Sequence, residues 1–382
     1  MVRYTQACPV IFGEGAVKDL GNQAKALGIS KAIVLTDEHI VKGDGYKICI
    51  QSLKDAGIGV VEFTECAADA PSDVVQEVSK LAKAEKVDGV VGIGGGSVLD
   101  AAKGVNLLFN NPGPITEYFG VPGLNPGYPY ICIPTTAGTG SEVTVFGVLK
   151  NSQTGAKGPA VFSAATLAIL DPVMTVTAPP AVTASTGMDA FAHAAEAMTS
   201  KTENPRADIL ALQAIKLIAK SLPKAVADGS DMAARSDLLF ASNLAGIAFN
   251  DAMIHLGHAI AHSAGVKFGL AHGFGCALGL PVAMEYAAKV KPNKVKLIGE
   301  AIGLSFGADD SPEVIGSKVS EGIKNLLKTV KIPSFKDMGI ARDDFLGMLE
   351  LVMSDVGFWF LPEPISEEDA LRYLEIAYDK YQ

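Results

Sequence analysis

The sequence has few of the features that mark secreted, membrane-spanning or nucleic-acid-binding proteins. Five cysteines in 382 residues, none in a CxxC pair, predict reduced thiols in a cytoplasmic protein rather than a disulfide framework. No apolar run reaches the ~18–20 residues of a membrane span, and the first residues lack the layout of a secretion signal. The net charge of −10, with no long basic run, argues against nucleic acid or an anionic membrane as partner.

Apolar residues, by contrast, are plentiful. Hydrophobic residues make up 48% of the chain and charged residues 19%, so a large core can be buried and global disorder is excluded. The length suits two domains on the usual prior of about 100–200 residues each.

The secondary-structure pattern of the sequence changes near Pro179–Pro180. Before this point β-rich runs alternate with helical patterns, which is typical of a parallel α/β sheet; the expected strands are 31–37, 58–65, 128–136 and 166–172. From Ala181 on, helical spacing dominates. We therefore expect an α/β dinucleotide-binding domain over 1–180 and an all-α metal-binding domain over 181–382.

A glycine-rich turn, GIGGGSVLDAAK (92–103), follows an apolar strand and opens a helix. Glycines let the backbone approach a ligand, and a helix N-terminus offers unpaired N–H groups to an anion such as pyrophosphate. The pattern departs from G-x-G-x-x-G because Ser97 takes the place of the last glycine. An ordinary strand-to-helix turn is the alternative.

Two further segments fit a dinucleotide site. Asp37 ends an early strand, and the ends of neighbouring parallel strands meet at one crevice. Its carboxylate would bind the 2′-hydroxyl of an adenosine ribose and repel a 2′-phosphate, which favours NAD over NADP. PTTAGTGSE (134–142) is a second Gly/Thr-rich loop whose hydroxyls and N–H groups suit a cofactor. Taken alone, Asp37 is equally consistent with an ordinary loop carboxylate, and 134–142 with an ordinary turn.

Four of the six histidines lie in HLGHAIAHSAGVKFGLAHG (255–273). On a helix His255, His258 and His262 would share an arc of roughly 60°, with His272 after a glycine-containing break. In GMDAFAHAAEA (187–197), Asp189 and His193 share a helix face because they are four apart. One carboxylate and three imidazoles, from Asp189, His193, His258 and His272, suit Zn²⁺ or Fe²⁺ in a catalytic site. Histidines packed in a core are the alternative.

These segments together resemble the iron-dependent (group III) alcohol dehydrogenases, within the superfamily that includes glycerol dehydrogenase and dehydroquinate synthase. The matching stretches extend from near the first strand almost to Pro281: GEGAVKDL (13–20), GGGSVLDAAK (94–103), IPTTAGTGSEVT (133–144), Lys157 with LAILDP (167–172), 187–197 and HAIAHSAGVKFGLAHG (258–273).

The resemblance implies a Rossmann-like N-terminal domain, a helical C-terminal domain and a cleft holding metal and NAD(P)(H). It places the metal on Asp189, His193, His258 and His272. The cofactor contacts it implies are Asp37, Gly94, Gly95, Gly96, Ser97, Asp100, Thr135, Thr136, Thr139 and Lys157. The implied reaction moves hydride between a small alcohol or aldehyde, polarised by Fe²⁺ or Zn²⁺, and the nicotinamide. Homo-oligomers, dimers or larger, are typical of the family.

Three side chains near the expected metal have open roles. His262 is our candidate catalytic residue for proton relay, with support of a ligand as the alternative. Glu196 orients a ligand imidazole or is a simple helix-face carboxylate. His255 touches substrate or packs in the core.

The C-terminal part departs from the family. GFWFLPEP (357–364) replaces a cysteine, small residues and Asn-Pro-Arg, and its bulky Phe358, Trp359 and Phe360 suggest a narrowed pocket and a small substrate. Cys276 replaces a common asparagine. The competing hypotheses are a glycerol- or polyol-type dehydrogenase, a dehydroquinate synthase-like lyase and a non-catalytic nucleotide-binding module.

Overall fold

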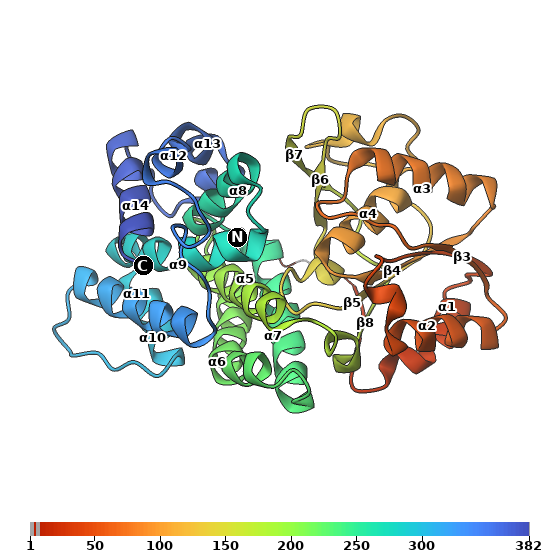
Figure 1. The fold of residues 1–382 in the computed structure, drawn as a ribbon, viewed down its shortest axis with the longest axis horizontal. Coiled ribbons are helices and arrows are strands. Elements are labelled where there is room, and N and C mark those ends of the chain that lie inside the picture. Colours follow the sequence, from red (N-terminus) through yellow and green to blue (C-terminus); the bar gives the residue numbers. More distant parts are fainter. Residues whose placement is uncertain (1–3, 5–7, 382) are drawn as a thin grey trace. The chain divides into compact units, whose positions relative to one another are not determined.

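The computed structural model describes residue 4 and residues 8–381 (Figure 1). The chain divides into two compact units, one ending at Ala178 and the other beginning at Pro179. The first is built on a parallel sheet and the second is mostly helical, as expected from the sequence.

The α/β unit contains a six-stranded sheet in the order β1-β8-β5-β4-β2-β3, and every pair in it is parallel. The strands are β1 (Val10–Phe12), β2 (Lys31–Leu35), β3 (Gly59–Phe63), β4 (Gly89–Gly94), β5 (Tyr130–Pro134) and β8 (Leu167–Leu170). Strands β4, β5 and β8 are buried along their whole length. Parallel strands covered on both faces read as continuous apolar runs, which is why the sequence revealed them.

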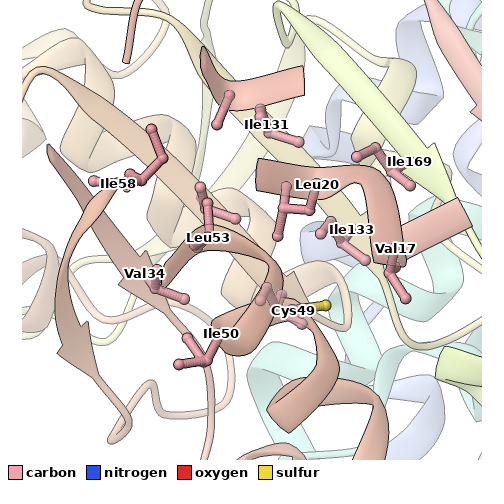
Figure 2. Packing of buried hydrophobic residues seen from close by; sticks show 14 of the residues in the cluster. Val17, Leu20, Val34, Cys49, Ile50, Leu53, Ile58, Ile131, Ile133 and Ile169 are labelled. Atoms are coloured by element: carbon pink, nitrogen blue, oxygen red, sulfur yellow. The ribbon is translucent and has the colours of Figure 1, made fainter. Parts of the chain in front are cut away.

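Helices link these strands in the order expected for crossover connections. They are α1 (Leu20–Ala26), α2 (Asp44–Asp55), α3 (Ser72–Ala84) and α4 (Gly96–Leu107). Figure 2 shows the core between α1, α2 and the sheet, where Leu20 and Leu53 pack with Val34, Ile131 and Ile169. All five side chains are fully buried.

Three strands were not expected from the sequence. β1 is only three residues long, and β6 (Phe146–Lys150) and β7 (Lys157–Val161) form a separate antiparallel pair. Gly147, Gly158 and Pro159 interrupt the apolar pattern of the pair. Its register places Lys150 opposite Lys157. Lys157 therefore lies on the two-stranded sheet and outside the six-stranded one.

The helical unit comprises ten helices among the described residues. The longer ones are α5 (Pro180–Thr199), α6 (Pro205–Ala227), α7 (Met232–Ala252), α8 (Leu256–Phe268), α9 (His272–Val290), α11 (Pro312–Thr329) and α14 (Glu367–Asp379); α10 (Pro292–Ala301), α12 (Arg342–Leu346) and α13 (Leu349–Ser354) are shorter. Side-chain caps start several of them. Asn204 accepts from the Ala207 N–H at α6, and Asp231 from the Ala234 N–H at α7, which satisfies amides a helix start leaves unpaired. Nowhere in the described chain is a helix both long enough and apolar enough to cross a membrane.

Candidate active site

Four side chains predicted as metal ligands converge in the helical unit. Asp189 and His193 project from α5, His258 from α8 and His272 from the first position of α9. One ligand atom from each lies within 4.8 Å of the others. Asp189 Oδ1 is 3.4 Å from His272 Nε2, 3.7 Å from His258 Nε2 and 3.8 Å from His193 Nδ1. The four residues come from three helices, and the first and last of them are 83 positions apart in the chain.

This cluster fits a divalent ion. Asp189 and His258 are 2% and 1% exposed, yet Asp189 Oδ1 and His258 Nε2 have no hydrogen-bond partner. Leaving such groups buried and unpaired costs roughly 1–3 kcal/mol each or more. Ligand atoms that each bind one ion at about 2.0–2.2 Å would lie about as far from one another as Asp189 Oδ1 lies from the three histidine nitrogens. A set of one oxygen and three nitrogens suits Zn²⁺ or Fe²⁺ and is too rich in nitrogen for Mg²⁺ or Ca²⁺.

The charge states also suit metal binding. Burial would raise the pKa of Asp189, but the surrounding histidines lower it well below its ordinary value, so the carboxylate is ionised. Burial lowers the pKa of His272 to about 3, against the pull of Asp189, so this imidazole is neutral with a free lone pair.

The three spaced histidines do not share one helix. α8 begins at Leu256, and His255 precedes it with non-helical backbone angles. His255 is fully buried and its Nε2 lies 2.8 Å from the Thr199 hydroxyl. The helix continues through Gly265 and ends at Phe268, followed by Gly269, whose φ of 67° suits glycine. The structure thus places His255 in the core, and the arc expected from the spacing holds for His258 and His262 alone.

His262 lies beside the cluster and has a carboxylate partner. Its ring stacks on that of His272 at 5.3 Å, and its Nδ1 is 3.0 Å from Asp355 Oδ2. Asp355 also accepts from the Gly357 N–H at 2.8 Å and so caps a short 3₁₀ segment, Val356–Phe360. Asp355 was not predicted from the sequence, because nothing in its neighbourhood resembles a motif.

The aromatic run lies on this 3₁₀ segment. Trp359 is 69% exposed, whereas Phe358 and Phe360 are half-buried. The Phe360 carbonyl accepts from the Lys201 N–H at 2.9 Å. Cys276, one helical turn after His272, has its sulfur 3.4 Å from His272 Nε2. Burial raises the pKa of this thiol to about 12, so it is neutral at physiological pH.

In the α/β unit, the glycine-rich turn forms as predicted between β4 and α4. β4 ends at Gly94, Gly95 occupies the N-cap and the helix begins at Gly96. A Cβ on Gly94 would lie 2.5 Å from Val98 Cβ, and one on Gly96 would lie 2.6 Å from Thr139 Cγ2. No side chain in the described residues caps this helix, so its first amides stay available for an anion.

The Thr-rich loop lies against the same turn. The Thr135 N–H donates to the Gly94 carbonyl at 3.0 Å. A Cβ on Gly95 would come 3.4 Å from Thr136 Oγ1. Thr139 Oγ1 accepts from the Ser141 N–H at 3.2 Å. The three threonines thus border the glycine-rich turn.

Lys157 and Ser97 are connected through Asp69, which no sequence motif indicates. Lys157 Nζ lies 2.6 Å from Asp69 Oδ1, and the Asp69 N–H donates to Ser97 Oγ at 3.0 Å. Asp69 and Ala70 both have positive φ, 64° and 46°, which is uncommon outside glycine. Backbone outliers concentrate at functional sites, but the sequence gives no sign of them.

Asp37 and Asp100 differ in how many of their carboxylate oxygens accept hydrogen bonds within the α/β unit. Asp37 follows β2, and its Oδ1 accepts from the N–H groups of His39 and Ile40, so it is held at the end of the strand beside β4. Both oxygens of Asp100 are used within the unit: Oδ1 accepts from the Ser141 hydroxyl at 2.6 Å and Oδ2 from the Val148 N–H at 2.9 Å. Asp100 therefore supports the loop around Ser141.

Comparison with known proteins identifies the chain. The family model described as "Iron-containing alcohol dehydrogenase" matches residues 8–172, and "Fe-containing alcohol dehydrogenase family, C-terminal" matches residues 183–378. The chain belongs to the iron-containing alcohol dehydrogenase family. This confirms the resemblance found in the sequence, and the protein is an enzyme of alcohol and aldehyde oxidoreduction.

Similar members of the family align over nearly the whole chain. Choline dehydrogenase of Bacillus subtilis (strain 168) is 35% identical over 93% of this chain and 90% of its own length. NAD-dependent methanol dehydrogenase of Bacillus methanolicus is 33% identical over 96% and 97%. A crystal structure of 1,3-propanediol oxidoreductase superposes with a TM-score of 0.95 at 34% identity, covering 99% of this chain and 100% of that one. The predicted two-part fold is thereby confirmed.

Proposed function

We propose that this iron-containing alcohol dehydrogenase interconverts a small alcohol and its aldehyde with NAD(H), using one divalent ion held by Asp189, His193, His258 and His272. The observation that carries the proposal is the convergence of these four side chains, with ligand atoms within 4.8 Å of one another and two of those atoms buried without a partner. Fe²⁺ is the ion we favour, with Zn²⁺ as the alternative for the same donor set.

The bound ion would act as a Lewis acid on the alcohol or carbonyl oxygen. The chain's own residues supply the rest. Asp189 contributes the single negative charge of the ligand set, and the imidazoles add three neutral donors. His262, stacked on His272 and held by Asp355, is our candidate for carrying the hydroxyl proton to and from solvent, because its ring is 27% exposed.

For the cofactor we propose the crevice where the sheet reverses its order. Strand β3 lies on one side of β2 and β4 on the other, and dinucleotides bind where successive connections diverge in this way. Asp37 follows β2, and the turn Gly94–Ser97 begins at the last residue of β4. The pyrophosphate would lie on the uncapped start of α4, beside Thr135, Thr136 and Thr139. Asp37 would take the adenosine ribose and favour NAD over NADP, and Lys157 would approach the nicotinamide ribose. Asp100 would act on this site through the loop it supports.

The domain roles follow: dinucleotide binding for the α/β unit and metal binding for the helical unit. We further propose a cytoplasmic location, in keeping with five free, buried cysteines, and a homo-oligomer, which is typical of the family. For the substrate, the names of the relatives range from methanol to choline and propanediol. The aromatic 3₁₀ segment favours a short substrate in this chain.

The experiment is a panel assay under anaerobic conditions. Protein loaded with Fe²⁺, and separately with Zn²⁺, is mixed with NADH or NADPH and short aldehydes, and absorbance at about 340 nm, the NADH band whose loss reports hydride transfer, is followed. Loss of absorbance that depends on metal, NADH and aldehyde together is expected. Absence of turnover with every aldehyde and with both metals would contradict the proposal.

A further inference from the structure

We propose that Glu196 is a positioning residue of the metal centre, whose carboxylate fixes the ring of His258 so that Nε2 is presented to the ion. The inference rests on the proposed metal site and assigns a role to a side chain that is not one of the four ligands. Glu196 lies on α5, seven positions after Asp189 and three after His193. Its side chain is fully buried.

The Glu196 carboxylate accepts four hydrogen bonds, all from the start of α8. Three come from backbone N–H groups: Oε2 is 3.1 Å from the nitrogen of His255 and 3.3 Å from that of His258, and Oε1 is 2.5 Å from that of Gly257. The fourth comes from the imidazole of His258, whose Nδ1 lies 2.5 Å from Oε2. These amides belong to the unpaired donors of a helix N-terminus, which attracts negative charge.

The fourth bond decides the chemistry of His258. An ionised carboxylate can only accept, so Nδ1 carries the proton and Nε2 keeps the lone pair that a metal needs. Nε2 has no hydrogen-bond partner and lies 3.7 Å from Asp189 Oδ1. A carboxylate that fixes the tautomer and orientation of a ligand imidazole in this way raises metal affinity about 10–100-fold.

The close approach of Glu196 depends on Gly257. A Cβ at this position would lie 2.7 Å from Glu196 Oε1 and 3.4 Å from the carbonyl carbon of Gly279. A methyl group there would displace the carboxylate, because 2.7 Å is closer than a real Cβ approaches another heavy atom, whereas the contact with Gly279 is an ordinary one. Gly257 therefore offers a second way to disturb the Glu196–His258 bond without changing either side chain.

A purely structural role for Glu196, as a buried cap of α8, would account for the three amide bonds. It would not account for the carboxylate being shared with the ring of a ligand. The two roles predict different measurements. A cap contributes to folding whether or not metal is present, whereas a positioning residue changes the affinity of the folded protein for metal.

The experiment uses Glu196→Gln in the full-length chain. The amide of glutamine keeps the size of the side chain and one acceptor oxygen. Its NH₂ group must then either face backbone N–H groups, which is unfavourable, or donate to His258 Nδ1, which leaves the ring proton on Nε2. We expect the dissociation constant for Zn²⁺, measured by competition with a chromophoric chelator, to rise about 10–100-fold. Glu300→Gln, the same change at an exposed position of the helical unit, is the matched control and should bind as the wild type does.

The tautomer gives a second readout. In metal-free protein with ¹⁵N-labelled histidine, the wild type should show His258 protonated at Nδ1, and Glu196→Gln should shift the proton toward Nε2. Gly257→Ala should weaken Zn²⁺ binding in the same direction, and it tests the inference if Glu196→Gln fails to fold. Binding by Glu196→Gln within about threefold of the wild type would overturn the inference and leave the proposed function intact. A wild-type protein that binds neither Fe²⁺ nor Zn²⁺ would overturn both.

Discussion

The Asp355 carboxylate connects His262 to the 3₁₀ segment that carries the aromatic run. It lies 3.0 Å from His262 Nδ1 and accepts from the Gly357 N–H at 2.8 Å. The two residues are 93 positions apart. One side chain thus orients a histidine that stacks on a proposed metal ligand and holds Phe358–Phe360 in place.

Asp355→Asn separates these two tasks. The amide oxygen can still cap Gly357, but the negative charge facing His262 is lost. We expect kcat to fall at least about tenfold, since a positioned acid or base contributes about 10²–10⁴-fold, while metal content stays unchanged. In a double-mutant cycle, Asp355→Asn combined with His262→Gln should be no slower than His262→Gln alone. Additive losses would show that Asp355 acts independently of His262.

His272→Ala tests the metal site at its most exposed ligand. The ring is 35% exposed, so the fold should survive its removal. We expect bound metal, measured by elemental analysis after dialysis, and turnover to be lost together. His39→Ala, which changes an 81% exposed histidine of the α/β unit, is the control and should keep both. Full metal content in His272→Ala would refute the ligand assignment.

Asp37→Asn tests the choice between NAD and NADP. The amide retains an oxygen that can accept the hydrogen bonds from the N–H groups of His39 and Ile40, as Asp37 Oδ1 does in the wild type. Without a negative charge, it no longer repels a 2′-phosphate. We expect the ratio of kcat/KM for NAD over NADP to fall about tenfold, equivalent to about 1.4 kcal/mol. The adjacent Glu38→Gln serves as control. An unchanged ratio would place the ribose elsewhere.

Gly96→Ala should weaken cofactor binding by steric means. Its Cβ would lie 2.6 Å from Thr139 Cγ2, so the turn and the Thr-rich loop must separate. We expect the dissociation constant for NADH, measured by fluorescence titration, to rise at least about tenfold. Adding Thr139→Ser, which removes Cγ2 and keeps the hydroxyl, should recover part of the loss. No recovery would mean that the glycine serves the backbone conformation alone.

The acid stability of the α/β unit should depend on Asp88. Its Oδ1 accepts from the N–H groups of Ser30 and Lys31 at 2.9 and 2.8 Å. Burial opposes ionisation, but these bonds and the Ser30 hydroxyl lower the pKa below its ordinary value of 3.8. A lowered pKa stabilises the fold above pH 3.8, and the stabilisation disappears as the pH falls through the folded-state value.

We therefore expect Asp88→Asn to lower the free energy of unfolding by about 1–3 kcal/mol at pH 7. The difference from the wild type should shrink as the pH is lowered past 3.8 toward 2.5, as measured by urea denaturation of both proteins across that range. A gap that is independent of pH would show that the bonds do not require the charge. Asp55→Asn, at an exposed helix end, is the control.

Periodic and motif-like features of the fold were predictable. Strands β4 and β5 are continuous apolar runs because both faces are covered, and the long helices show their spacing directly. The short β1 and the β6–β7 pair were missed, because a strand's partners, rather than its own residues, determine whether three to five residues pair.

Local spacing alone predicted that Asp189 shares a helix face with His193, and His258 with His262, because helix geometry fixes which residues lie on the same face. The sequence by itself also determined the glycine-rich turn, where only glycine fits beside Val98 and Thr139. Tertiary packing alone decided the remainder. It brought Glu196 to the start of α8, removed His255 from the site by burying it against Thr199, joined Asp355 to His262 and Asp69 to Lys157, and engaged Asp100 within its own unit. The physical reason is that hydrogen bonds between segments far apart in the chain depend on where whole helices and loops pack, and no short pattern encodes that.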